Sequence, residues 1–379
     1  MTELDAAAPN NPLYLLRNYS NGFANTAAFD ALDIDNGASA VLSGRDGLAP
    51  FTDAVTWRNK TSSPEAILNY MSVLNGMGLT MVYDVGRPSE GNLDPLEDLA
   101  AKRDLPLRVF HTLRYSASDE ASTNDALELI NGGAKPFSND PQFGLLGLGE
   151  HIYAPMLDNA NWTKEWEEGT WGPFSEISFA AARNGWTVHE HVMSQATAVQ
   201  YLNLIEDIAK EIPEVSELRW TFAHVNGIQD EDIARAAELG VAFGVHSQAR
   251  MSVRAMDAPR IGSLSRSGAL WGLGSDAGIV APANPFWTLE WAISGTNVAG
   301  RSGWSEDQRV SREQALRAHT TYNAKLLFVE DDLGTLEVGK LADLVVLDQD
   351  YMTIEATEIS SIKPVLTMTG GEVVYQSAD

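Results

Sequence analysis

Short apolar runs alternate with amphipathic segments over most of the chain after residue 75. Each apolar run has the length of a buried strand, and the segment that follows repeats its apolar residues at helical spacing. Several helical segments end in glycine, which is common just beyond a helix C-terminus. Strands that alternate with helices predict a parallel sheet. The strands that we expect span residues 78–86, 105–113, 143–153, 185–193, 218–226, 240–248 and 269–277.

This many strand and helix units favours an α/β fold of the TIM-like (β/α) barrel type over an open doubly wound sheet. Such a barrel has eight strands and the pattern supplies seven, so one strand is unaccounted for. Residues 1–330 are expected to form the barrel, with an insertion region near the N-terminus. Residues 331–379 are expected to add the strands of a small β-rich appendage.

The two ends of the chain fit the alternation less well. Near the N-terminus, residues 13–18 predict a strand and residues 25–34 a short helix. Beyond the barrel, residues 310–328 have a helical pattern. Residues 334–350 and the final strand at 365–376 alternate apolar with polar positions, which predicts a small sheet packed beside the barrel.

Composition restricts the possible partners. The 379 residues include 52 acidic and 26 basic side chains, which gives a formal net charge of -26. A surface this negative repels nucleic acid and anionic membranes, so a small-molecule substrate is the expected partner. The absence of cysteine excludes disulfides, thiolate metal ligands and cysteine nucleophiles. With no signal-like N-terminus and no apolar run that could span a bilayer, we expect a cytoplasmic protein, and a homo-oligomer is compatible with the sequence.

Six of the seven histidines lie within or at the ends of predicted strands. Catalytic groups of a parallel barrel gather where the carboxyl ends of its strands meet, so these side chains are expected at one mouth. In the stretch TVHEHVM, His189 and His191 are two residues apart and face the same side of a strand. Each histidine taken alone could equally be a packed core imidazole. The six are His111, His151, His189, His191, His224 and His246.

Asp276 follows the last predicted strand, in the segment GLGSDAG. A carboxylate that faces two imidazoles suits a hydrolytic metal site. Neutral imidazoles hold a divalent ion, the ion lowers the pKa of bound water, and the carboxylate takes the proton.

Several segments, taken in order, resemble the amidohydrolase superfamily. GWTVHEHVMSQATA, LRWTFAHVNGIQDEDIARAAELGVAFGVHSQ and ALWGLGSDAG look like its fifth to eighth barrel strands, and LGTLEVGKLADLVVLDQD looks like its returning C-terminal strand. More narrowly, they are similar to the family 3 branch that includes N-substituted formamide deformylases. LYLLRNYSNGFANTAAFDALDI and MGLTMVYDVG extend the resemblance over nearly the whole chain. It implies a metal-dependent hydrolase of C–N bonds other than peptide bonds.

The resemblance also implies roles for particular residues. His191 falls on the fifth-strand metal ligand and His224 on the sixth-strand ligand, while Asp276 falls on the aspartate that contacts metal and acts as general base. The implied cofactor is one or two divalent ions, with zinc favoured. His189 is expected to support His191 rather than to be the principal ligand. The side chains expected around the substrate or against the ligands are His111, His189, Asn226 and His246.

Two departures from the family pattern are large. The family's first strand carries a His-x-His pair, yet the first histidine here is His111. Together with the count of seven strands, the resemblance therefore implies that the first barrel strand is missing. Relatives carry a lysine at the end of the fourth strand that can bridge metals once carboxylated, and Glu150 takes that place. Glu150 could bind metal through its carboxylate or be a solvated residue at a loop edge. Gln195 stands where related deaminases have a proton-shuttling glutamate, which disfavours a deaminase.

These observations leave two function classes open. The leading hypothesis is a zinc-dependent hydrolase of amide-like C–N bonds in a small molecule, in which Asp276 activates a metal-bound water. The alternative is a truncated or degenerate relative that has lost catalysis and acts as a binding or interaction protein. A tryptophan-rich insertion could be a lid over the mouth or an anchor for its own loop; its tryptophans are Trp162, Trp166 and Trp171.

Overall fold

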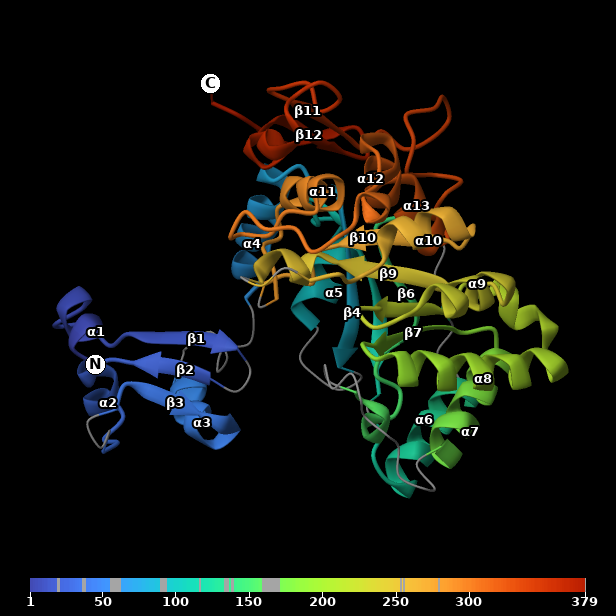
Figure 1. Ribbon diagram of the computed structural model, residues 1–379, viewed down its shortest axis with the longest axis horizontal. Helices are drawn as coiled ribbons and strands as arrows, with labels where there is room; N and C mark the ends of the chain where they lie inside the picture. The colour runs from blue at the N-terminus through green and yellow to red at the C-terminus, as the bar shows by residue number, and fades with distance from the viewer. Residues whose placement is uncertain are drawn as a thin grey trace. The chain divides into compact units, whose positions relative to one another are not determined.

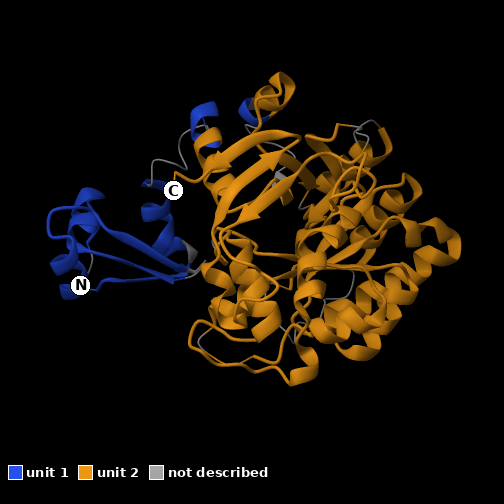
Figure 2. Cartoon of the chain, turned by 90° about the horizontal axis from the view of Figure 1, so that it is seen from above, with its two compact units in different colours: residues 1–67, 92–96 blue, residues 68–91, 97–379 orange. Residues whose placement is uncertain are grey.

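The structure is a computed structural model of the chain. It describes residues 1–378 except for 19–20, 36–38, 55–62, 89–93, 116, 133–135, 138–139, 159–170, 253, 255 and 279. Two compact units are present, one of residues 1–67 with 92–96 and the other of residues 68–91 with 97–379 (Figure 2). Within the described residues, no helix is both long enough and apolar enough to cross a membrane.

The smaller unit contains an antiparallel sheet in the order β1-β2-β3. Asn25 organises this unit, because its side chain caps helix α2 through the Ala28 amide and donates to the carbonyls of Ala8 and Asn11. The strand and the short helix expected near the N-terminus are confirmed. The elements are α1 (Thr2–Ala7), β1 (Tyr14–Asn18), β2 (Asn21–Ala24), α2 (Thr26–Ala31), β3 (Val41–Ser43) and α3 (Gly44–Ala54).

The larger unit is built on a parallel sheet of seven strands in the order β10-β9-β8-β7-β6-β5-β4, so spatial order follows chain order (Figure 1). Each strand overlaps one of the seven expected from the sequence, and the TIM-like barrel class is confirmed. Strands β4 and β10 form the two edges. The strands are β4 (Met81–Pro88), β5 (Arg108–Arg114), β6 (Phe143–Glu150), β7 (Thr187–Val192), β8 (Thr221–His224), β9 (Ala242–His246) and β10 (Trp271–Gly274).

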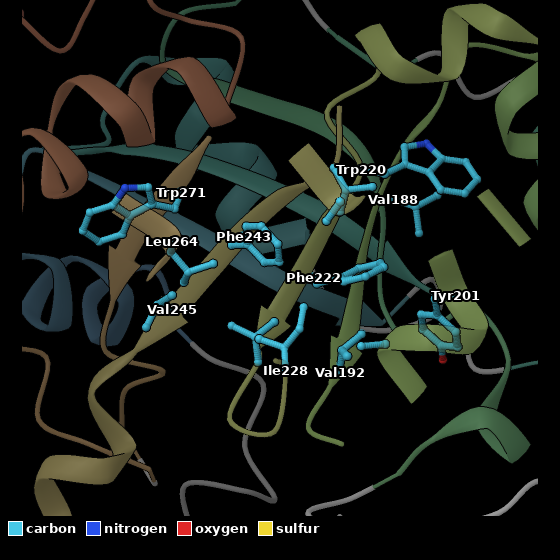
Figure 3. Close-up of a cluster of buried hydrophobic side chains, with 14 of the residues drawn as sticks. Val188, Val192, Tyr201, Trp220, Phe222, Ile228, Phe243, Val245, Leu264 and Trp271 are labelled. Atoms are coloured by element: carbon cyan, nitrogen blue, oxygen red, sulfur yellow. The ribbon is translucent and has the colours of Figure 1, made fainter. Parts of the chain in front are cut away.

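Helices follow the strands and pack on the outer side of the sheet (Figure 1). Figure 3 shows the apolar layer between them, where Phe222 and Phe243 point from adjacent strands toward side chains such as Tyr201 of α8. Burial of these side chains is the main force that holds strands and helices together. The helices from residue 64 onward are α4 (Pro64–Gly76), α5 (Asp94–Lys102), α6 (Glu120–Gly132), α7 (Trp171–Arg183), α8 (Gln195–Glu211), α9 (Asp230–Glu238), α10 (Ile261–Ser267), α11 (Pro285–Ser294), α12 (Arg312–His319) and α13 (Thr321–Leu326).

The C-terminal segment differs from expectation in two places. The helix expected at 310–328 is two helices, α12 and α13, because the backbone of Thr320 leaves the helical region at φ -126° and ψ -87°. The final strand expected at 365–376 is a hairpin of β12 (Pro364–Thr369) and β13 (Glu372–Gln376). Gly370 and Gly371 both have positive φ, which suits a tight hairpin turn. These strands pair with β11 (Leu344–Leu347) in a small antiparallel sheet, and the domain boundary expected at residue 330 stays a prediction.

A buried ion pair attaches this small sheet to the barrel strands. Arg108 of β5 donates from Nε and Nη2 to both carboxylate oxygens of Asp343, at 2.9 and 2.8 Å. Their side chains are only 6% and 9% exposed. The Asp343 carboxylate also accepts from the amide of Gly370 in the hairpin turn.

The substitution Asp343→Asn should therefore destabilise the larger unit strongly, because it leaves the Arg108 guanidinium buried without a counter-charge. We expect a loss of about 3–5 kcal/mol in unfolding free energy. A matched control is Arg103→Gln, which breaks the exposed pair with Asp140 and should cost no more than about 1 kcal/mol. Thermal and urea unfolding would compare the variants, and equal midpoints would contradict the prediction.

Candidate metal centre

Three neighbouring strands bring a carboxylate and two imidazoles together at the carboxyl edge of the sheet. Glu150 is the last residue of β6, His191 is the next-to-last residue of β7, and His224 ends β8. The strands are parallel and directly paired, and Val192 lies opposite His224 in the register. Groups at the ends of adjacent parallel strands therefore meet at one rim.

The Glu150 carboxylate lies between the two rings. Its Oε1 atom is 2.6 Å from His191 Nδ1 and 2.6 Å from His224 Nε2. The ring centroids of the two histidines are 4.4 Å apart. One nitrogen or oxygen ligand atom from each residue lies within 4.8 Å of the other two, which is compatible with binding one ion. Among the donors, imidazole nitrogen and carboxylate oxygen suit zinc and related divalent metals.

Charge pairing governs the protonation of this group. Burial alone would raise the pKa of Glu150, but contact with His191 and His224 holds it well below its usual range. Burial alone would lower the pKa of His191, but the carboxylates of Asp158 and Glu150 outweigh it and raise the pKa to about 9. Without an ion, the site is thus a carboxylate balanced by a protonated imidazole at neutral pH.

A second group of possible ligands shares His224 with the first and adds His246 and Asp276. The rings of His224 and His246 are 4.3 Å apart, and His246 Nε2 is 3.9 Å from an Asp276 oxygen. The side chain of Asp276 is 43% exposed, and partial burial raises its pKa. The structure thus brings His191, His224 and Asp276 to one rim, with Asp276 in the second group rather than beside His191.

The tautomer of His246 follows from its backbone contact. The amide of Gln248 donates to His246 Nδ1 at 3.1 Å, so Nδ1 carries a lone pair. Burial lowers the pKa of His246 well below its usual range, and the ring is neutral with its proton on Nε2. Because Nε2 is the atom that faces Asp276, His246 presents a hydrogen-bond donor to the rim and is a poor metal ligand in this state.

Two rim residues and one neighbour have a strained backbone. The rim residues His224 and Asp276 have φ of 72° and 54°, and Val225, next to His224, has φ of 50°. Side chains with a Cβ atom rarely adopt this left-handed region, and a β-branched valine is especially disfavoured there. Such strain costs about 1–3 kcal/mol per residue and persists where the surrounding packing enforces it, which is frequent at functional sites.

The supporting residues named from the sequence lie at different depths. His189 is buried one pleat below His191, with its ring 5.5 Å from that of Tyr83 on β4, and burial lowers its pKa to about 4. Asn226 is buried two residues beyond the end of β8. His111 lies in the middle of β5 and packs against Phe143, which begins β6 at the end opposite Glu150. The ring of His111 is therefore not part of the rim.

Glu190, the residue between the two histidines of β7, faces the outer side of the sheet. It lines a small cavity together with Phe174 of α7 and Tyr201 of α8. Burial raises its pKa well above its usual range. The strand thus alternates imidazoles toward the barrel interior with a buried acid toward the helices.

Two residues at the rim, His151 and Asp158, were not identified as specific site residues from the sequence. His151 follows Glu150, and its ring lies 5.2 Å from that of His191; burial lowers its pKa to about 4. Asp158 Oδ1 lies 3.2 Å from His191 Nε2. Asp158 follows the short 3₁₀ helix η1 (Ala154–Met156), in a segment without strand or helix periodicity, so sequence spacing gave no signal for it.

Gln195 and the tryptophan-rich insertion contribute differently. The Gln195 amide bonds to Asp232 through Nε2, and its Oε1 accepts from the amide of Gln229 at 2.9 Å. Its side chain therefore ties α8 to α9. Trp162 and Trp166 lie outside the described residues. Trp171 begins α7 and packs edge-on against Phe174 and Tyr201, so it is anchored to the outer layer.

Comparison with known proteins identifies the family of this chain. The sequence pattern of the amidohydrolase family matches residues 1–375. The chain belongs to the amidohydrolase family. It is 23% identical to the N-substituted formamide deformylase of Arthrobacter pascens, over 99% of this chain and 75% of that protein. It is also 25% identical to the Arabidopsis thaliana protein LONG AFTER FAR-RED 3, over 53% of this chain and 36% of that protein.

Solved structures share the fold of this amidohydrolase. An uncharacterized metal-dependent hydrolase from Pyrococcus furiosus has a TM-score of 0.65 at 20% identity, covering 91% of this chain and 74% of that one. An atrazine chlorohydrolase from Arthrobacter aurescens, solved with zinc, has a TM-score of 0.57 at 18% identity, covering 87% of this chain and 78% of that one. At these identities the likeness concerns the fold alone.

The ring of His189 packs closely against Gly244 of strand β9. A Cβ atom added at Gly244 would lie 3.0 Å from His189 Cε1 and 3.2 Å from its Nε2. We therefore expect Gly244→Ala to displace the ring and to destabilise the protein by about 1–3 kcal/mol. Gly172→Ala is the control, because nothing lies within 4 Å of its added Cβ atom. Thermal unfolding would measure both, and an unchanged midpoint for Gly244→Ala would contradict the expected clash.

Proposed function

We propose that this amidohydrolase is a metal-dependent hydrolase that cleaves amide-like, non-peptide C–N bonds of a small molecule. The convergence of Glu150 Oε1, His191 Nδ1 and His224 Nε2 at one point of the rim carries the proposal. The name of the Arthrobacter pascens relative describes cleavage of N-substituted formamides, and we propose the same class of bond here.

Glu150, His191 and His224 would hold the ion, for which zinc is the best match to the donors. A divalent ion at this position supplies Lewis-acid chemistry, because it polarises a carbonyl group and makes water more acidic. Glu150 stands where relatives of this family carry a lysine that can be carboxylated, and its own carboxylate would supply a hard, negatively charged oxygen for the cation.

Asp276 is proposed as the general base. Its side chain is partly exposed at the rim, where water enters, and its raised pKa makes the carboxylate a better proton acceptor than an ordinary aspartate. His246 faces the same place with Nε2–H, and it can donate a hydrogen bond to the oxygen of the scissile group as negative charge develops there. A proton taken by Asp276 can then pass to the leaving nitrogen.

The metal proposal predicts which substitutions abolish ion binding. Purified protein equilibrated with zinc should hold at least one ion per chain, and His191→Ala and His224→Ala should each weaken binding by more than the roughly 10–100-fold cost of losing an outer partner. Glu150→Gln should weaken it as well. Because the pKa of His191 is about 9 and only the neutral ring binds metal, zinc affinity should rise with pH up to that value.

Elemental analysis and competition with a chromophoric chelator would measure these affinities. The control is His319→Ala on α12, a histidine placed outside both ligand groups, which should bind zinc as the parent protein does. If the parent protein holds no stoichiometric metal, and if zinc and manganese change neither its stability nor its hydrolysis, the proposed function fails.

If Asp276 is the general base, its substitution should lower the turnover rate and leave zinc binding intact. Asp276→Asn should lower kcat for an N-substituted formamide by about 10²–10⁴-fold, because the amide cannot accept the proton. The asparagine side chain has the same shape as aspartate, so the zinc content of the variant should change little. Asp207→Asn on the exposed face of α8 is the control and should keep full activity. Steady-state hydrolysis measures both variants, and undiminished kcat in Asp276→Asn would exclude this residue as the base.

A second candidate function has its own support. Strands β4 and β10 each pair with a single neighbour in the described sheet, and open edges invite pairing with another chain. A family member that has lost catalysis could then act as a binding or interaction protein. The metal analysis separates the two, since a non-catalytic member need not bind zinc or respond to Asp276→Asn.

A further inference from the structure

The hydroxyl group of Thr112 on β5 joins β4 to β6 beside the candidate metal centre. Its Oγ1 atom accepts from the amide of Gly86 on β4 at 2.9 Å and donates to the carbonyl of Gly149 on β6 at 3.1 Å. Gly149 immediately precedes Glu150 in the chain. Thr112 is fully buried. One side chain therefore connects three neighbouring strands at the point where the carboxylate ligand leaves the sheet.

The register of the sheet is irregular on both sides of Thr112. Against β4, two residues, one of them Gly86, lie between the paired positions Asp84 and Arg87. Against β6, one residue, Leu146, is skipped just before the partner of Thr112. Such β-bulges interrupt the backbone ladder, bend the strand and are frequent beside active sites. The Thr112 hydroxyl supplies hydrogen bonds at this interruption.

The irregular part of β4 packs against the backbone of Glu150. A Cβ atom added at Gly86 would lie 3.1 Å from the Glu150 amide nitrogen and 3.4 Å from its Cβ atom. Gly86 has φ of 105°, a conformation that glycine adopts readily and other residues do not. Because β5 separates β4 from β6 in the sheet, the two hydrogen bonds of Thr112 connect the segments that meet at Glu150.

The position of Glu150 has little tolerance. Its Oε1 atom lies 2.6 Å from a nitrogen of each ring, and ligand distances at a metal site are defined to within about 0.2 Å. On the β7 side, Glu150 is held by its backbone pairing with Glu190. On the β5 side, the paired register of β6 ends at Leu148. The hydrogen bond from Thr112 continues this hold to Gly149, the residue before the ligand.

We propose that Thr112 is a positioning residue of the candidate metal centre: its hydroxyl joins the irregular segments of β4 and β6 and so fixes the backbone from which Glu150 reaches His191 and His224. The inference deepens the proposed function and rests on it for the metal. The position of Glu150 can be measured without any metal.

The decisive variant is Thr112→Val, which keeps the shape of the side chain and removes the hydroxyl. The Gly86 amide and the Gly149 carbonyl then each lose a hydrogen bond in a buried place, and the end of β6 is free to shift. Thr112→Ser keeps the hydroxyl and should restore the parent behaviour.

A matched control separates positioning from structural support. Thr367 on β12 is also fully buried, and its Oγ1 atom donates to the Asn75 carbonyl at 2.7 Å. It lies outside both groups of possible metal ligands. Thr367→Val therefore removes a buried hydroxyl of the same kind without touching the site. Both valine variants should lower the thermal midpoint, so stability alone does not distinguish them.

Crystal structures of the metal-free variants and zinc titration against a chromophoric chelator give the deciding measurements. In Thr112→Val, we expect Glu150 Oε1 to lose its 2.6 Å contact with at least one of the two rings. Zinc affinity should fall by about 10–100-fold, as for other losses of an outer partner. Thr112→Ser and Thr367→Val should keep both the contacts and the affinity of the parent protein.

Hydrogen exchange of the metal-free parent protein tests the same contact without any variant. The Gly86 amide should exchange slowly, because it donates to a buried hydroxyl. Free exchange of this amide in the parent protein overturns the role of Thr112 even if Thr112→Val fails to fold.

The remaining outcomes distinguish the two proposals. An unmoved Glu150 in Thr112→Val overturns the role of Thr112, and so does a zinc affinity in a zinc-binding parent that Thr112→Val and Thr367→Val change equally. If Glu150 moves as expected but the parent protein binds no zinc, Thr112 remains the positioning residue of Glu150 and the proposed hydrolase function fails instead.

Discussion

The candidate site depends on one carboxylate oxygen shared by two imidazoles. Glu150 Oε1 lies 2.6 Å from nitrogens of both His191 and His224, at the ends of three strands that pair directly with one another. This contact requires β6, β7 and β8 to be adjacent, parallel and in the observed register, since a slip of one residue would turn His191 to the outer face. Contact with the two histidines lowers the pKa of Glu150, and the carboxylates of Asp158 and Glu150 raise the pKa of His191, in both cases against the effect of burial.

The surrounding fold enforces an arrangement that the local backbone would not choose. His224 and Asp276 adopt left-handed φ angles, and Gly244 leaves the space that the ring of His189 occupies. Strain of this kind persists only where packing over-determines the conformation. Here the outer layer of aromatic and aliphatic side chains between the strands and α7 to α10 provides that packing, and the ion pair between Arg108 and Asp343 fixes the small C-terminal sheet to the same strands.

The rim divides into two chemically different halves that meet at His224. Glu150 and His191 form a charged half that suits a cation. Asp276 and His246 form a half that is only partly closed to solvent, with a carboxylate of raised pKa and a neutral ring whose Nε2–H faces outward. In the proposed hydrolase the first half holds the ion and the second moves a proton and binds the developing charge. Asp158 lies beside the first half, with its Oδ1 atom 3.2 Å from Nε2 of His191.

The hydrophobic pattern alone determined the seven strands, their helices and the placement of most histidines at strand ends, because burial of one face imposes a period that can be read along the chain. The pattern could not distinguish His111, which packs at the end of the sheet opposite Glu150, from the histidines of the rim. A predicted strand does not show how far along its length a side chain lies from the rim. Nor could it find the hairpin at Gly370 or the break at Thr320, which are decided by local backbone angles.

The position of Asp158 was beyond sequence reasoning for a related reason. It lies in an irregular segment, and only the tertiary fold brings that segment against the turn between β7 and α8. Packing likewise places the Glu150 carboxylate between two rings from neighbouring strands rather than free in solvent, and its role as a metal ligand stays a prediction. The sequence thus determined which side chains could offer nitrogen and oxygen ligand atoms. The register of adjacent strands determined which of these atoms meet. The physical reason is that hydrogen bonds and metal binding depend on distances in space, and the spacing of residues along the chain does not contain those distances.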